Sequence, residues 1–166
     1  HLTCVSNTKE DVDRIAEELR INNIENILAL RGDLPEGVER AEDFAHASDL
    51  TAYLAAKGGF DLAGACYPET HPEAANEIDD IRNLKQKVDA GASHLVTQLF
   101  FDNEIFYRFR DKAVLAGIEV PIEAGIMPVI RKSQIERMVT LCGASLPAPF
   151  VRVMNRYGDD PEQMRD

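Results

Sequence analysis

Residues 60–100 decide the fold, and they read FDLAGACYPETHPEAANEIDDIRNLKQKVDAGASHLVTQLF. Two short apolar runs, 60–66 and 94–100, flank a segment of helical period over 74–90 that stops at Gly91. Buried apolar strands that alternate with amphipathic helices form parallel sheets, so this stretch predicts a βαβ unit of an α/β protein. The apolar face of its helix consists of Ile78, Ile81, Leu84 and Val88.

The same alternation runs through most of the chain. Further strands are predicted at 2–5, 26–30 and 120–124, and the strands follow one another at intervals of roughly 25 to 35 residues. This interval suits either an eight-stranded β/α barrel or a doubly wound sheet. About five units are visible, so a barrel would be incomplete at both its beginning and its end. Five other helices are predicted. One starts after Thr8, a second covers 41–57, a third begins after Asp102 and stops at Gly117, a fourth runs from about Ser133 and stops at Gly143, and a fifth lies around 150–154.

Composition limits the classes of partner. Lys and Arg number 18 against 29 Asp and Glu, and the net charge of −11 opposes nonspecific binding to nucleic acid or anionic membranes. No apolar run approaches the roughly 18 to 20 residues of a membrane-spanning helix, and the first residues do not resemble a secretion signal, so a cytoplasmic location is expected. Cys4, Cys66 and Cys142 are far apart, which predicts buried, inert thiols and no disulfide framework.

Ligands of parallel β/α proteins bind where the strands lead into helices. The strand at 26–30 is followed by Arg31, Gly32 and Asp33, which form either an ordinary surface loop or a ligand-contacting one. The strand at 60–66 leads into a proline-stiffened loop with Tyr67 and His71, on which a planar ligand could stack. A metal site at Glu69, His71 and Glu73 is not predicted, because this spacing matches no standard closed site.

The helix at 74–90 also carries a polar line, Asp80, Asn83 and Lys87. Such a line is usually a solvated face, but beside a ligand loop it also suits ribose hydroxyls and phosphates. Gln98 is an amide within an apolar strand, so it either bonds within the core or points at a substrate. Gly125 ends the strand at 120–124 and predicts a close backbone approach.

Several common motifs are absent. The sequence contains no G-x-G-x-x-G, P-loop, G-x-S-x-G or H-E-x-x-H pattern. A dinucleotide-binding Rossmann domain, a nucleotide hydrolase, a serine hydrolase and a zincin therefore have no motif support.

An ordered set of segments gives a more specific indication: residues 1–4, 26–35, 67–69, 71–74, 97–102 and 125–128. In this order and spacing they resemble the methylenetetrahydrofolate reductase family, of which the chain would be a central fragment. The resemblance implies that residues 1–166 are part of a single FAD-binding (β/α)8 barrel domain that lacks its N-terminal and C-terminal units. It also implies a flavoprotein oxidoreductase of one-carbon metabolism and methionine biosynthesis, assembled as a homo-oligomer.

The implied reaction is reduction of 5,10-methylenetetrahydrofolate to 5-methyltetrahydrofolate, with NADH or NADPH as electron donor. The hydride would pass through FAD in a ping-pong sequence. By resemblance, the substrate would contact Asp33, Gln98 and Gln134, and Asp33 would also be the catalytic residue. The residues implied to bind FAD are His1, Arg31, Gly32, Asp33, Ala65, Tyr67, His71, Asp80, Asn83 and Lys87.

The chain departs from the family pattern at Ala124, Gln86 and Met138, where the family tends to have proline, a second cation and an aromatic residue. We expect these differences to alter FAD affinity or nicotinamide handling and not the reaction. The family's general-acid glutamate would lie upstream of His1. Two other readings stay open: a flavin-free, phosphate-binding lyase on a similar barrel, and a non-catalytic flavin-binding or scaffold fragment.

Overall fold

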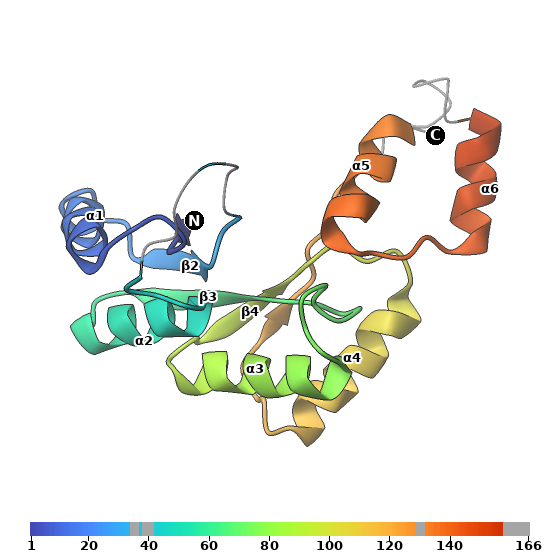
Figure 1. The fold of residues 1–166 in the computed structure, drawn as a ribbon. Helices are drawn as coiled ribbons and strands as arrows, with labels where there is room; N and C mark the ends of the chain where they lie inside the picture. The colour runs from blue at the N-terminus through green and yellow to red at the C-terminus, as the bar shows by residue number, and fades with distance from the viewer. Residues whose placement is uncertain (34–36, 38–41, 129–131, 158–166) are drawn as a thin grey trace.

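The strands form one parallel sheet in which spatial order follows chain order (Figure 1). The computed structural model describes residues 1–33, 37, 42–128 and 132–157. Within them each strand pairs in parallel with the next, and a doubly wound sheet would instead reverse its order partway. The α/β prediction is therefore confirmed, and the sequential strand order is consistent with part of a β/α barrel. The strands are β1 Leu2–Thr3, β2 Asn26–Leu30, β3 Asp61–Cys66, β4 His94–Thr97 and β5 Ile122–Glu123.

Helices alternate with these strands, and α2, α3 and α4 line up along one face of the sheet (Figure 1). Connections of one hand place successive helices on the same face when the strands are laid down in order. The last two helices stand apart from this row. The helix bounds are α1 Lys9–Ile21, α2 Ala47–Lys57, α3 Glu77–Asp89, α4 Asn103–Leu115, α5 Lys132–Cys142 and α6 Ala148–Tyr157. No helix in the described part of the chain is both long and apolar enough to span a bilayer.

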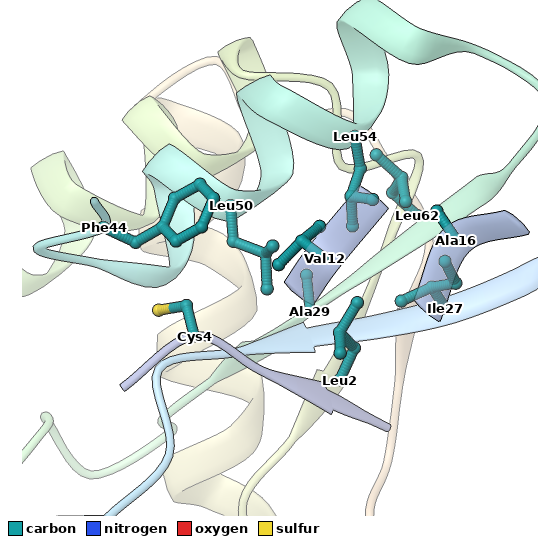
Figure 2. Close-up of a cluster of buried hydrophobic side chains, with 10 residues drawn as sticks. All are labelled: Leu2, Cys4, Val12, Ala16, Ile27, Ala29, Phe44, Leu50, Leu54 and Leu62. Carbon is teal, nitrogen blue, oxygen red and sulfur yellow. The ribbon is translucent and has the colours of Figure 1, made fainter. Parts of the chain in front are cut away.

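The core lies between the sheet and its helices. In β2, Ile27 and Ala29 are buried against α1 and α2, whereas Leu28 and Leu30 on the opposite face stay partly exposed. Figure 2 shows the first cluster, which combines residues from the strands with residues of α1, α2 and the segment before α2. A second cluster between the sheet and α3 and α4 contains Cys66, Leu84, Leu95, Phe109, Ala113 and Ile118.

Local capping explains where the helices begin. The expected start after Thr8 is confirmed, since Thr8 Oγ1 accepts a hydrogen bond from the Asp11 N–H at 3.2 Å. The predicted helix at 41–57 was too long, because α2 begins at Ala47. There the Asp49 carboxylate accepts bonds from the N–H groups of Ala45 and His46. The predicted start at Ala41 lies outside the described residues, as do residues 34 and 35.

Other predicted helices and strands were also longer than the observed ones. The helix predicted from residue 74 begins at Glu77, because the Asn76 side chain caps it by accepting from the Asp79 N–H at 2.9 Å. The strand predicted at 94–100 ends at Thr97, and Asp102 already caps α4. The strands predicted at 2–5 and 120–124 are each reduced to the two residues of β1 and β5.

The close approach predicted at Gly125 is present, and its partner is the neighbouring strand. The Gly125 N–H donates to Thr97 Oγ1 at 2.9 Å, and a Cβ on Gly125 would lie 2.2 Å from the Thr97 carbonyl oxygen. Any side chain here would push β5 away from β4, so packing of the protein against itself already explains this glycine.

We predict that Gly125→Ala lowers the free energy of unfolding by about 3 kcal/mol, because the added methyl collides with backbone. Urea denaturation of the full-length protein measures this loss. Gly117→Ala is the control, since a Cβ there meets only Lys85 Cε at an ordinary 3.6 Å and its φ of +76° is the strained feature. That control should cost about 1 kcal/mol, and equal losses for the two variants would contradict the packing argument.

Candidate functional site

A polar rim forms where β2 and β3 lead into their loops. Arg31 directly follows β2, and its guanidinium forms a two-pronged ion pair with the Glu73 carboxylate of the β3–α3 loop. Arg31 Nη2 donates to Glu73 Oε1 at 2.7 Å, while Nη1 bonds the other carboxylate oxygen. Hydrogen bonding to Glu73 raises the pKa of Arg31, and the nearby charge of Asp33 acts in the same direction. The rim therefore joins two loops that are far apart in sequence.

His71 lies at the centre of this rim. Its backbone N–H donates to Asp80 Oδ2 at 2.9 Å, and its Nδ1 accepts from the Glu73 N–H at 3.1 Å. The imidazole also packs edge-to-face on Tyr67, with the ring centroids 4.5 Å apart. The predicted pair of Tyr67 and His71 is thus brought together, although each ring packs on the other within the loop.

The side chain of Lys87 extends from α3 to β3, beside the polar rim. Its side chain is partly buried between α3 and β3, and Nζ donates to the Ala65 carbonyl at 2.5 Å. Its stem crosses Gly64, where a Cβ would lie 2.6 Å from Lys87 Cδ, so the small residue makes room for the cation. Nζ carries two further N–H donors, and no described residue accepts from them.

Burial and neighbouring charge shift the pKa values of Lys87 and Asp80 in opposite directions. Removal from water lowers the pKa of Lys87, and the neighbouring Asp80 partly opposes this shift. Burial likewise raises the pKa of Asp80, against the hydrogen bond from His71 and the charge of Lys87. Asp80 and Lys87 from the predicted polar line therefore lie close enough for the charge of each to influence the pKa of the other. The third member, Asn83, is exposed on α3 and makes no side-chain hydrogen bond to the described residues.

Among the remaining predicted cofactor residues, Gly32, Asp33 and Ala65 lie at or near the same edge, whereas His1 lies at the amino end of β1. His1 is exposed immediately before β1, and Asp33 is exposed beside Arg31. Gly32 has a φ of +84°, and a Cβ there would come within 2.9 Å of Thr3 Cβ. Packing of Gly32 against β1 therefore already requires a glycine at this position, whether or not a ligand binds. Ala65 is partly buried near the end of β3.

The predicted substrate amides make bonds within the protein. Gln98 Oε1 accepts from the Leu99 N–H at 2.8 Å, and its own backbone N–H donates to the Cys66 carbonyl at 2.7 Å. Gln134 on α5 approaches Met127 Sδ with Nε2 at 3.6 Å. Both side chains are partly buried, and neither belongs to the polar cluster around His71.

An apolar hollow of about 550 Å³ lies beyond the ends of β4 and β5. Phe100 stacks on Phe106 with centroids 5.2 Å apart, and Phe101 stacks on Phe150 of α6 at 5.3 Å. The Phe100 and Phe101 pair was the available sequence signal, but its partner Phe150 lies on a distant helix. The lining comprises Leu99, Phe100, Phe101, Asn103, Phe106, Tyr107, Ala124, Gly125, Ile126, Met127 and Phe150.

Sequence reasoning missed the roles of two loop carboxylates. The spacing of Glu73 argues against a metal site and predicts no partner, yet its carboxylate accepts hydrogen bonds from Arg31. Glu69 Oε1 accepts from the Ser145 N–H at 2.9 Å and so ties the β3–α3 loop to the segment before α6. Among the described residues, no three His, Cys, Asp or Glu side chains gather in a way that would hold a metal ion.

The sequential parallel sheet with alternating helices has the strand order of a β/α barrel, a class of protein in which ligands bind at the carboxyl ends of the strands. The sequence matches the family described as methylenetetrahydrofolate reductase over residues 1–166. The chain belongs to this family.

Curated relatives carry the same description. The chain is 43% identical over 162 residues to the 5,10-methylenetetrahydrofolate reductase of Escherichia coli K12, covering 98% of this chain and 54% of that protein. It is 38% identical over 180 residues to a rice protein named probable methylenetetrahydrofolate reductase (NADH), covering 99% of this chain and 30% of that protein. The chain thus spans about half the length of its bacterial relative.

A solved structure shares the fold. It is an uncharacterised protein from Clostridium thermocellum, described as binding two copies of 5-methyl-5,6,7,8-tetrahydrofolic acid. The TM-score is 0.56 at 16% sequence identity, over 96% of this chain and 76% of that one. This likeness supports the architecture.

We predict that the thiol of Cys66 is inert in the folded protein. Cys66 is 2% exposed, and burial raises its pKa to about 12, so its thiolate fraction at pH 8 is about a thousandfold below that of a free thiol. Iodoacetamide labelling followed by peptide mapping should show negligible modification of Cys66 without urea and full modification in urea. Rapid labelling under native conditions would contradict the buried placement.

Proposed function

We propose that the chain forms the central part of a flavin-dependent methylenetetrahydrofolate reductase. Membership of the family supports reduction of 5,10-methylenetetrahydrofolate to 5-methyltetrahydrofolate. The rice relative is named for NADH, which supports NADH or NADPH as the donor. When bound, FAD would supply the hydride carrier between donor and folate, which bind in turn.

The observation that carries the proposal is the under-satisfied cation of Lys87. A partly buried ammonium with a single acceptor among the described residues, near Asp80, suits a ligand that brings negative charge. The rim therefore fits FAD: Lys87 would hold the pyrophosphate, and Asp80 and Asn83 the ribose and adenosine end. His1, Arg31, Gly32, Asp33, Ala65, Tyr67 and His71 would line the flavin end.

Asp33 is proposed as the catalytic residue. Its exposed carboxylate sits beside Arg31 and Tyr67, and its charge acts on both. A negative charge here would stabilise the cationic iminium form of the folate, which is the form that accepts hydride. The same charge would disfavour extra negative charge at the flavin end of the site.

Gln98 and Gln134 are proposed to bind the folate. Turning the Gln98 amide away from the Leu99 N–H would free its oxygen for the pterin. Gln134 contacts Met127 in the wall of the apolar hollow, where stacked phenylalanines can receive a planar apolar group. The hollow would thus take part of the substrate that the charged rim cannot hold.

The other proposals concern the whole protein. Residues 1–166 would be part of a single FAD-binding β/α barrel domain, completed by units on both sides. Assembly as a homo-oligomer and a cytoplasmic location also stay predictions.

We predict that the full-length protein purifies with the absorbance spectrum of a bound flavin. NADH or NADPH should bleach this spectrum, and methylenetetrahydrofolate should restore it.

A second prediction concerns Lys87. Lys87→Met should weaken FAD binding about tenfold or more, through loss of a charge-assisted contact of roughly 1.5 to 3 kcal/mol. Stability without FAD should not fall, because an apolar side chain of similar length replaces a desolvated charge. Dialysis with flavin quantitation and urea denaturation measure the two effects. Unchanged occupancy would remove Lys87 from the cofactor site.

We predict that Asp33→Asn leaves FAD bound but slows folate reduction at least about tenfold more than flavin reduction by the nicotinamide. The carboxylate matters most when positive charge develops on the folate. Stopped-flow rates of the two half-reactions measure this difference. Equal slowing of both, or no slowing, would exclude the proposed role of Asp33.

A further inference from the structure

A chain of contacts links three of the proposed cofactor residues, and Glu73 is its connecting member. Asp80 accepts from the His71 N–H, and His71 Nδ1 accepts from the Glu73 N–H. The Glu73 carboxylate then accepts from both terminal nitrogens of Arg31. The contacts run from α3 through the β3–α3 loop to the end of β2. Glu73 itself has no place among the proposed ligand residues.

The geometry of the ion pair leaves part of the guanidinium available. Glu73 occupies one N–H on each terminal nitrogen of Arg31, whereas Nε and the remaining N–H groups make no hydrogen bond to any described residue. A planar guanidinium held at two points by one carboxylate has a defined plane. Its remaining donors are therefore presented to a ligand in one orientation.

Glu73 affects the binding of an anionic ligand in two opposing ways: it orders the Arg31 side chain, and it adds a negative charge. The larger of the two effects decides the outcome. A long arginine side chain loses much rotamer freedom when it binds a ligand, so prior ordering by Glu73 favours binding. The negative charge of Glu73 opposes an anionic ligand, but its side chain is 61% exposed and water screens it. The ordering effect is expected to dominate.

We propose that Glu73 is a positioning residue that holds the Arg31 guanidinium in the orientation in which it meets the flavin cofactor. This inference rests on the proposed function, which places Arg31 against that cofactor. The backbone of Glu73 is fixed in turn by His71, so a ligand that orders His71 would also order Arg31.

The first test needs no cofactor. Phenylglyoxal modifies accessible, unpaired arginines, and peptide mapping of the full-length protein freed of ligand gives the rate at Arg31. Glu73→Gln should speed modification of Arg31 about three- to fivefold, the factor expected for loss of a partly exposed ion pair. The matched control is Glu69→Gln, which removes the same charge from the same loop but bonds the Ser145 N–H. It should leave the Arg31 rate unchanged.

The second test is a double-mutant cycle on FAD affinity. In the native background, Glu73→Gln should raise the dissociation constant of FAD about three- to tenfold, and Glu73→Asp should restore part of the loss. In the Arg31→Ala background, Glu73→Gln should change the constant by less than about twofold, because the guanidinium that Glu73 orients is then absent.

The outcomes separate the two claims. An unchanged Arg31 modification rate in Glu73→Gln, or an equal increase in Glu69→Gln, would overturn the inference. So would the same loss of FAD affinity in both backgrounds, since that pattern marks a merely structural role for the loop. A wild-type protein that binds no FAD would instead overturn the proposed function and the cofactor half of this inference, while the modification rates would still decide whether Glu73 holds Arg31.

Discussion

Parallel pairing of β2 with β3 is the constraint on which the site depends. The register joins Asn26 to Asp61 and Ala29 to Gly64, so the two strands end at the same edge of the sheet. Arg31 and the loop that carries His71 and Glu73 therefore leave the sheet side by side. A slip of one residue would move Ile27 and Ala29 out of the core, so burial of the first hydrophobic cluster holds the rim in place.

Three glycines near this edge are required by packing within the protein, whether or not a ligand binds. Gly64 admits the stem of Lys87, Gly125 admits the Thr97 carbonyl, and Gly32 lies against Thr3. Each one lets two backbone segments, or a backbone and a cation, approach more closely than a Cβ would permit. The compact rim and the partly buried position of Lys87 both follow from these small residues.

The edge of the sheet divides into two chemically different parts. The ends of β2 and β3 carry charged groups in mutual contact, whereas the ends of β4 and β5 border an aromatic hollow. A ligand with phosphate and ribose groups suits the first part, and a planar apolar group suits the second. The proposed reductase needs both kinds of surface close together, because cofactor and substrate must meet.

The sequence by itself determined the β/α alternation, the start of α1 after Thr8 and the residues that resemble a known family. These depend on neighbours in the chain: Thr8 and Asp11 are one helical turn apart, and apolar periodicity is local. Only the tertiary structure decided that Glu73 bonds Arg31 across 42 residues, that Lys87 lies over Gly64, and that Phe150 closes on Phe101. Periodicity shows which face of an element is apolar, but the partner of a charged or aromatic side chain depends on which strands pair and in what register.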